Sequence, residues 1–515
     1  MSTKSPLLDS GLFYTSSTDS LLNNPFPKQS RISYRLPEQD RRAELRFQEG
    51  VTFRNRNQKQ EAVECFAEAV VLAPSNTEYL LALGQVEFEL DHLTEATFCF
   101  EKLTRLEPKD ASAWLTLGFI QFRLQQFEEA IAPLSEAVYL DPASADATFY
   151  LAESFRLTQR YEESIPLYQR LVPVGSQRPQ GVYGYALSLL ALGRLEEGWE
   201  AFEFRMISKL GTWQQHNLLN WDGTPDPVKT VLAYSEEGIA ADIMYASCLP
   251  DLAQSVGRCV VECDESLHSL FARSFPGITF SPLSTRPLDS SKRFDDPLFE
   301  TKYDPKSRHP LSEAEIDEQV AFGSLPRFFR KSMEKFTKAD AFLKADPAIS
   351  AKWAKFFAQK SSNPKVGVLW QGTFTGESEA QRTIPVEFFR PLLAKTHIDW
   401  ISLQQGSRQA DVKKIRSDWR LKIDEYPEVF RYGQMEELAG LLSNVDLVIS
   451  PPGYVANLAA ALGVETWLIV PYPVDWRWTL QDETTPWFPK MRLLKQHRDE
   501  PLHKIGLRLQ NLLNR

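Results

Sequence analysis

The residues best suited to bind phosphate lie in the stretch DLVISPPGYVANLAAALGV, residues 446–464. An apolar run ends at Ser450, a Pro-Pro-Gly turn follows, and a helix of small residues begins. Ligands of open α/β sheets bind where strands end, and free N–H groups at a helix start favour phosphate. Gly453 and Tyr454 would let backbone approach a diphosphate, and Asn457 could hydrogen-bond to it. The alternative is an ordinary strand–loop–helix packed through its alanines.

A second stretch, VGVLWQGTFTGESEAQRTIP at 366–385, repeats this arrangement. A strand ending near Trp370 runs into a Gly/Thr loop, and Arg382 follows the loop. A guanidinium there could bind phosphate through two hydrogen bonds. A surface arginine is otherwise usually solvated.

A third stretch, YPVDWRW at 472–478, is followed closely by Trp487. The tryptophans are interleaved with Asp475 and Arg477, a composition that fits a wall for stacking a sugar or a base. An equally good interpretation is a lid that packs one lobe on another.

Carboxylates form the fourth candidate. Glu236, Glu237 and Asp242 lie between the end of a predicted strand, 230–234, and the start of a predicted helix. One of them could act as general base towards an acceptor hydroxyl. Carboxylates also occur at helix starts simply because the helix dipole favours them.

The elements that must position these residues alternate between short apolar runs and helical stretches. This alternation is typical of a parallel sheet covered by helices. It occurs twice, over 207–345 and over 346–515, which predicts two Rossmann-like lobes with a cleft between them. The predicted strands are 230–234, 259–263, 365–370, 399–405, 446–450 and 466–472.

The preceding part of the chain has a period of 34 residues. Residue types recur at this step in three series: Pro74, Pro108, Pro142; Gly50, Gly84, Gly118; and Ala62, Ala96, Ala130. Thirty-four is the length of the tetratricopeptide repeat, a pair of antiparallel helices. We therefore predict an α-solenoid over 41–206 that holds a protein partner on its concave face. Residues 1–40 lack a sustained period and predict a disordered or loosely packed arm.

The overall composition of the chain excludes several classes of function. A formal net charge of −10 argues against a general nucleic-acid binder. The five cysteines show no metal-ligand spacing and indicate reduced thiols. No apolar run long enough to span a membrane and no signal pattern is present, so we expect a cytoplasmic protein.

Taken together, the four stretches resemble bacterial proteins that join tetratricopeptide repeats to a heptosyltransferase-like glycosyltransferase domain. That domain is similar in plan to the O-linked N-acetylglucosamine transferase. The resemblance spans about residues 41–500. It rests on Glu236 to Asp242, Trp370-Gln371-Gly372, Arg382 to Pro385, Ser402-Leu403-Gln404, Val455 to Gly463 and Trp476 to Leu493.

The resemblance implies a GT-B fold and transfer of a sugar from a nucleotide-diphospho-sugar co-substrate. We expect an inverting transfer without a metal ion or other cofactor, because the loops implicated contain no Asp-x-Asp motif. The resemblance places the donor in the second lobe and a catalytic carboxylate in the first. The implied donor-binding residues are Gln371, Arg382, Gln404, Gly453, Tyr454, Asn457 and Arg477, and the implied catalytic residues are Asp242 and Glu237.

Several positions depart from the family pattern, among them Pro452-Gly453, which stand in place of Asp-Thr before the helix. Ala241 stands where the acceptor base is expected, leaving Asp242 or Glu237 to replace it, and Asn457 stands in place of a histidine. The alternative function is therefore a catalytically degenerate GT-B fold that serves as a repeat scaffold or binding protein. A plain adaptor with an unrelated α/β domain is a third interpretation.

Overall fold

The computed structural model describes residues 37–174, 179–208, 218–283, 285–287, 301–303, 315–371, 383–404, 409–430 and 435–514. Most of the predicted arm, residues 1–36, and the loop that carries Arg382 lie outside these ranges. The described residues form two compact units. The repeat unit extends to Leu189, and the C-terminal unit contains Leu190–Met206 together with the described residues from 218 onwards.

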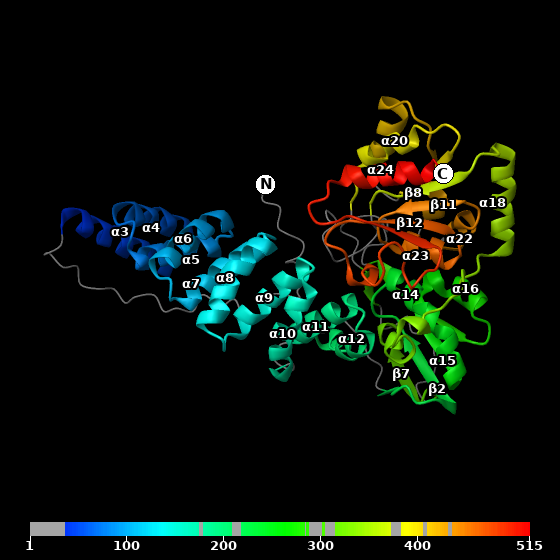
Figure 1. Cartoon of the computed structure of the whole chain (residues 1–515), viewed down its shortest axis with the longest axis horizontal. Helices are drawn as coiled ribbons and strands as arrows, with labels where there is room; N and C mark the ends of the chain where they lie inside the picture. Colours follow the sequence, from blue (N-terminus) through cyan, green and yellow to red (C-terminus); the bar gives the residue numbers. More distant parts are fainter. Residues whose placement is uncertain are drawn as a thin grey trace. The chain divides into compact units, whose positions relative to one another are not determined.

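The repeat unit consists of helical hairpins, as the 34-residue period predicts (Figure 1). In the first three hairpins, a glycine of the first helix faces a bulky side chain of the second. A Cβ on Gly118 would lie 2.5 Å from Cγ of Leu134, so only glycine allows this approach. The hairpins are α3 (Glu38–Asn55) with α4 (Lys59–Leu72), α5 (Thr77–Glu89) with α6 (Leu93–Leu106), α7 (Ala111–Arg123) with α8 (Phe127–Leu140), and α9 (Ala145–Leu157) with α10 (Tyr161–Leu171).

The 34-residue period is also seen in the residues that cap the helices and in the turns within the hairpins. Asn76, Asp110 and Ser144, each two residues after a periodic proline, cap the next helix by accepting hydrogen bonds from its first N–H groups. The turn inside each hairpin holds a residue with φ between 59° and 63°, and these residues are Asn57, Asp91, Gln125 and Gln159.

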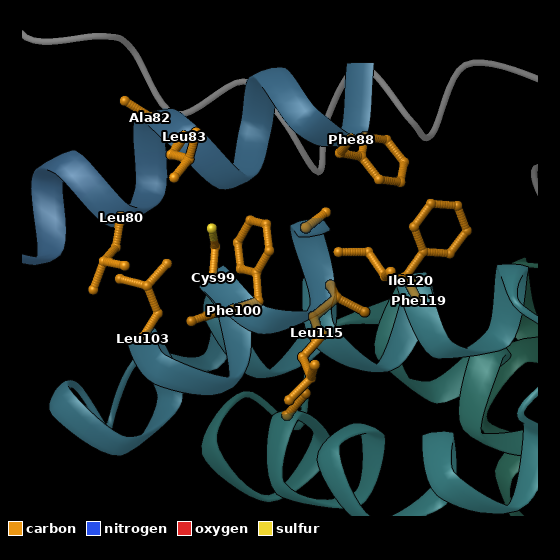
Figure 2. Close-up of a cluster of buried hydrophobic side chains, with 14 of the residues drawn as sticks. Leu80, Ala82, Leu83, Phe88, Cys99, Phe100, Leu103, Leu115, Phe119 and Ile120 are labelled. Carbon is orange, nitrogen blue, oxygen red and sulfur yellow. The ribbon is translucent and has the colours of Figure 1, made fainter. Parts of the chain in front are cut away.

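Neighbouring hairpins share one apolar core. Figure 2 shows part of it, where Leu80 and Leu83 of α5 lie beside Phe100 and Leu103 of α6, and Phe88 of α5 faces Phe119 of α7. All six side chains are at most 9% exposed. Each hairpin therefore buries its apolar face against the next one.

The C-terminal unit begins with helices that the sequence groups with the repeats. Within the segment 190–206 lie the end of α11 (Pro179–Ala191), α12 (Leu195–Phe202) and the start of α13 (Arg205–Ser208). Trp199 of α12 is 1% exposed and donates a hydrogen bond to the Arg330 carbonyl at 3.1 Å. Residues 190–206 thus belong to the core of the C-terminal unit.

The first sheet of this unit has five parallel strands in the order β1-β7-β2-β3-β4. The chain order reverses between β2 and β7. The strands are β1 (Leu219–Asn220), β2 (Asp226–Tyr234), β3 (Val256–Asp264), β4 (Thr279–Leu283) and β7 (Glu318–Ala321), with helices α14 (Ile239–Tyr245), α15 (Leu249–Ser255), α16 (Glu265–Ser274) and α17 (Leu325–Phe329). A separate antiparallel pair joins β5 (Thr285–Pro287) to β6 (Thr301–Tyr303).

The second sheet has six parallel strands in the order β10-β9-β8-β11-β12-β13. Its chain order reverses between β8 and β11. The strands are β8 (Lys365–Val368), β9 (Asp399–Ser402), β10 (Asp424–Glu425), β11 (Leu447–Ser450), β12 (Glu465–Val470) and β13 (Met491–Lys495). The helices are α18 (Pro347–Lys360), α20 (Arg390–Leu393), α21 (Gln409–Lys413), α22 (Met435–Leu442), α23 (Tyr454–Ala461) and α24 (Leu502–Leu513).

All six predicted strands are present, although β8, β9 and β12 end two or three residues earlier than predicted. The helix predicted after strand 230–234 is divided into α14, a 3-10 turn and α15, with Pro250 near the start of α15. Proline has no N–H to continue the helical ladder. The sequence analysis missed β4, β7 and β13 and the short strands β1, β5, β6 and β10.

Candidate functional site at the junction of the two sheets

The carboxyl ends of strands from both sheets meet at one junction. Helix α14, which follows β2, packs on α23, which follows β11 (Figure 1). The Asn457 side-chain amide of α23 donates to the Ala240 carbonyl of α14 at 2.8 Å. Arg477, which follows β12, binds Glu237, which follows β2, with 3.0 Å between Nη2 and Oε2. Ligands of parallel sheets bind at such strand ends, so this junction is the candidate site.

A buried arginine occupies the reversal point of the first sheet. Arg205 of α13 is 1% exposed, and its Nη2 lies 2.6 Å from Oε1 of Glu236 and 2.9 Å from Oγ of Ser324. Glu236 follows β2, and its Oε1 also accepts from the Gly323 N–H, which follows β7, at 2.9 Å. A Cβ on Gly323 would lie 2.5 Å from that oxygen, so a larger residue there would have to displace the Glu236 carboxylate.

The charges in this cluster depend on one another. Burial raises the pKa of Glu236, while Arg205 opposes the shift. For Arg205, burial acts to lower the pKa, but the attraction of Glu236, Glu203 and Glu237 outweighs it and raises the pKa. Two guanidinium contacts and a backbone N–H stabilise the carboxylate, so we treat the pair as charged. Arg205 could not be singled out from the sequence, because two of its partners, Glu236 and Ser324, lie more than 30 residues away from it along the chain.

Glu237, a predicted catalytic residue, lies between two guanidinium groups. Its carboxylate is 3.0 Å from Arg477 and 3.5 Å from Nε of Arg205, and the Tyr245 hydroxyl donates to it at 3.4 Å. Its side chain is only 5% exposed. The neighbouring Gly238 is exposed and has φ of 86°, so the backbone reaches the surface beside this carboxylate.

Asp242, the other predicted catalytic residue, is fully buried in α14. The Ser235 hydroxyl donates to its Oδ2 at 2.6 Å, and Oδ1 has no hydrogen-bond partner among the described residues. Burial raises the pKa of Asp242 well above its usual range, Ser235 opposes the shift, and Glu236 adds to it. An acceptor hydroxyl has no route to this carboxyl group in the conformation described.

The buried carboxyl of Asp242 predicts a pH-dependent stability. Its pKa is higher in the folded than in the unfolded chain, so its contribution to stability is present below about pH 4 and is lost as pH rises towards the folded pKa. Asp242→Asn removes this loss, because asparagine does not ionise. We expect the stability of Asp242→Asn relative to wild type to increase with pH from about 4, by at most about 1.4 kcal/mol per pH unit.

Urea unfolding at pH 4 to 8 measures this difference. Asp340→Asn, which changes an aspartate with a side chain 66% exposed, is the control for losing a carboxylate. A difference between Asp242→Asn and wild type that is constant or decreases with pH would contradict the prediction.

Four predicted donor-binding residues lie at the carboxyl ends of the central strands of the second sheet. Oε1 of Gln404, after β9, accepts from the N–H groups of Trp370 and Gln371, after β8, at 3.3 and 3.0 Å. Gly453 and Tyr454 follow β11, the strand that pairs with β8 at the reversal point. Sequence reasoning thus selected residues that the sheet order brings to neighbouring strand ends.

Of the other three predicted donor-binding residues, Asn457 and Arg477 are bound to groups of the protein itself. Asn457 is 3% exposed and bound to the Ala240 carbonyl, and its Oδ1 has no partner within the described part of the chain. Arg477 contacts Glu237 and Asp475. Arg382 lies outside the described residues.

The tryptophans of the third stretch pack against other side chains. Trp476 and Trp487 both contact Trp199 edge-on, with ring centroids 5.6 and 6.2 Å apart. Trp487 also packs on Tyr245 of α14. These rings are at most 6% exposed, so they form the packing that the sequence offered as the alternative to a stacking wall.

No group of three or more His, Cys, Asp or Glu side chains within the described ranges could hold a metal ion. All five cysteines are free and buried, and burial raises the pKa of Cys259 to about 12. Among the described helices, none combines the length and apolar character needed to cross a membrane.

Comparison with known proteins identifies the class of the N-terminal part. Two family models, both described as Tetratricopeptide repeat, match this chain, one over residues 77–110 and the other over 99–145 and 136–181. Together with the hairpins, these matches show that the N-terminal region contains tetratricopeptide repeats, a module for binding protein partners.

One curated relative is Protein FlbA of Caulobacter vibrioides, 27% identical over 316 residues. The match covers 60% of this chain and 51% of FlbA, so this chain spans about half the length of that relative. Solved structures with local likeness include MamA (20% identity, TM-score 0.31, 32% of this chain and 91% of MamA) and YrrB, a repeat protein with an unusual peptide-binding site (17%, 0.30, 32% and 84%). The repeat assignment rests on the sequence matches and the hairpins, not on these scores.

Proposed function

We propose that the C-terminal unit has a GT-B fold and transfers a sugar from a nucleotide-diphospho-sugar to an acceptor. The observation that carries this proposal is the convergence of two parallel sheets, each with a reversal of strand order, on one junction through their carboxyl ends. A donor bound at one sheet would face an acceptor held at the other.

The donor is assigned to the reversal point of the second sheet. Its diphosphate would contact the backbone at Gly453 and Tyr454, near Gln371 and Gln404, with Arg382 supplying positive charge. N–H groups and a guanidinium aimed at the leaving diphosphate would stabilise the charge that develops there, without an essential metal ion.

Glu237 is the better of the two candidate bases, because Asp242 is completely buried. In the proposed step an acceptor oxygen attacks the anomeric carbon as the bond from that carbon to the diphosphate oxygen breaks. The hydroxyl proton passes to Glu237, and the anomeric configuration inverts. The Glu237–Arg477 ion pair must open for this transfer.

The repeats would present the acceptor, which we take to be a protein. Repeat arrays bind partners on extended concave surfaces, and here the array and the C-terminal unit are parts of one chain. The base and sugar of the donor are left to the experiment.

Gln404→Glu tests the donor site directly. Glutamate keeps an oxygen that can accept from the Trp370 and Gln371 N–H groups but adds a negative charge beside the proposed diphosphate. We expect binding of the preferred nucleotide sugar to weaken by about tenfold or more, equivalent to about 1.4 kcal/mol. Thermal shift and calorimetry with UDP-, GDP-, ADP- and CMP-linked sugars would measure it.

Gln359→Glu is the matched control, since it makes the same change on the exposed side of α18. Binding should be lost in Gln404→Glu and retained in Gln359→Glu. If no nucleotide sugar binds the wild-type chain at millimolar concentration, the proposed donor site is wrong.

A second candidate function is a repeat scaffold whose GT-B fold has lost catalysis. Specific observations favour it: Arg205 fills the reversal point of the first sheet, and the Asn457 amide is engaged by the Ala240 carbonyl. Donor binding without transfer or donor hydrolysis would select this function, whereas turnover would select the enzyme.

A further inference from the structure

Helix α3 has an outer face that no other described helix covers. We define it by the residues that line a hollow of about 520 Å³: Leu45, Arg46, Gln48, Glu49, Thr52, Phe53 and Arg56. Leu45 is 42% exposed, although it is a large apolar residue. Phe47 and Gly50 of α3 pack against Phe66 of α4, and the hollow lies beside this contact, since Arg46 in its lining also binds Glu68 of α4.

The 34-residue register shows what this face is. Leu45 corresponds to Tyr79, Ala113 and Ala147 of the following repeats, which are 4%, 3% and 0% exposed. The residues equivalent to Thr52 are all fully buried, namely Val86, Ile120 and Ser154. In those repeats the preceding hairpin covers the position, as α4 packs on α5 and α6 on α7. The outer face of α3 therefore occupies the position that is buried between hairpins in the following repeats, although Arg46 and Glu49 stand where the next repeat has Leu80 and Leu83.

Two polar atoms on this face lack partners, although both side chains make other contacts, Arg46 with Glu49 and Glu68 and Gln48 with Glu44. Nε of Arg46 and Oε1 of Gln48 are shielded from solvent and have no hydrogen-bond partner in the described structure. Buried polar groups are normally satisfied, so a donor and an acceptor here indicate that another segment supplies their partners. A backbone C=O of an adjoining segment could accept from Nε of Arg46, and a backbone N–H could donate to Oε1 of Gln48.

We propose that residues 1–36 of the same chain dock on the outer face of α3 and cap the repeat array. This segment joins α3 directly, at Glu38. From there to Arg56 the helix is about 27 Å long at 1.5 Å per residue, a distance that about eight extended residues span. The 36 residues are therefore ample to run back along the whole face. Their apolar groups, Leu7-Leu8, Leu12-Phe13-Tyr14 and Leu21-Leu22, supply side chains for the hollow beside Leu45 and Phe53.

A tethered segment fits this face better than a second copy of the chain. The lining residues come from one helix, so a symmetric contact would bury far less than the roughly 800 Å² per partner of a stable interface. A segment attached through the end of α3 acts at an effective concentration on the order of millimolar. At this effective concentration, a small apolar contact is enough to keep the segment docked on α3.

Hydrogen exchange of the full chain, read by mass spectrometry, tests the proposal. Amides in part of residues 1–36 should be protected in the wild-type chain, and Leu45→Arg should reduce that protection at least tenfold. Leu45 is exposed in the described structure, so this change does not disturb the described core. Val71→Arg is the matched control, because Val71 lies on α4 of the same repeat and is 77% exposed. It should leave protection unchanged.

The outcomes are distinct. Exchange of residues 1–36 at unprotected rates in the wild-type chain overturns the proposal, and so does protection that Leu45→Arg leaves intact. Protection that depends on protein concentration also overturns it, because the occupant is then a second copy. Only concentration-independent protection, lost in Leu45→Arg and kept in Val71→Arg, supports it.

Discussion

Replacing Arg205 with methionine is expected to lower the free energy of unfolding of the C-terminal unit by about 3–5 kcal/mol. The guanidinium is 1% exposed and contacts Glu236 at 2.6 Å and Glu203 at 2.9 Å. Methionine fills similar space but leaves the Glu236 carboxylate buried with only the Gly323 N–H as a partner. An unpaired buried charge is far more costly than the loss of a favourable contact.

Urea unfolding of the full chain measures this cost. Tryptophan fluorescence reports mainly on the C-terminal unit, because all the chain's tryptophans except Trp114 lie in 190–206 or 211–515. The control is Arg327→Met, which breaks an ion pair with Glu200 whose side chains are 34% and 51% exposed, and should cost at most about 1 kcal/mol.

The double variant Arg205→Met, Glu236→Gln separates charge from packing. It should recover part of the lost stability, because glutamine removes the charge that Arg205→Met leaves unpaired. Equal losses in Arg205→Met and Arg327→Met, or no recovery in the double variant, would show that the buried ion pair is not the cause.

Trp199→Ala should be comparably destabilising, by about 3–5 kcal/mol in the C-terminal unit. The indole is 1% exposed and packs edge-on against Phe202, Trp476 and Trp487. Truncation removes the contact area, opens a cavity between three aromatic rings and leaves the Arg330 carbonyl without its indole donor.

Trp199→Phe isolates the hydrogen bond, since it keeps a ring and removes only the N–H and part of the indole. Its cost should be smaller, about 1–2 kcal/mol. Phe356→Ala on α18, where the ring is 42% exposed, is the control for losing an aromatic side chain. If Trp199→Ala costs no more than Phe356→Ala, residues 190–206 are not part of this core.

Much of the fold followed from local patterns. The 34-residue period predicted the hairpins because glycine, alanine and proline repeat where helices touch or end, as Gly118 against Leu134 illustrates. The alternation of apolar runs predicted the strands because buried parallel strands are apolar on both faces. The strands it missed are short or interrupted by polar residues, such as β7 with Glu318 and Gln319.

The candidate site could be predicted only in part. The position of a residue directly after a strand is a local property, so Gln371, Gln404 and Gly453 could be assigned to strand ends from the sequence. The partners of a side chain are not local. The contacts of Asn457 with Ala240 and of Arg477 with Glu237 join residues more than 200 positions apart.

Local patterns were enough to predict that helical repeats precede two groups of parallel strands, since periodicity and strand patterns are properties of neighbouring residues. Three-dimensional packing was needed to show that Arg205 and Trp199 belong to the C-terminal unit, and that Asp242 is buried while Glu237 lies between two arginines. Burial and ion pairing depend on which strands become neighbours. Sheet order, set by packing of the whole chain, fixes that choice.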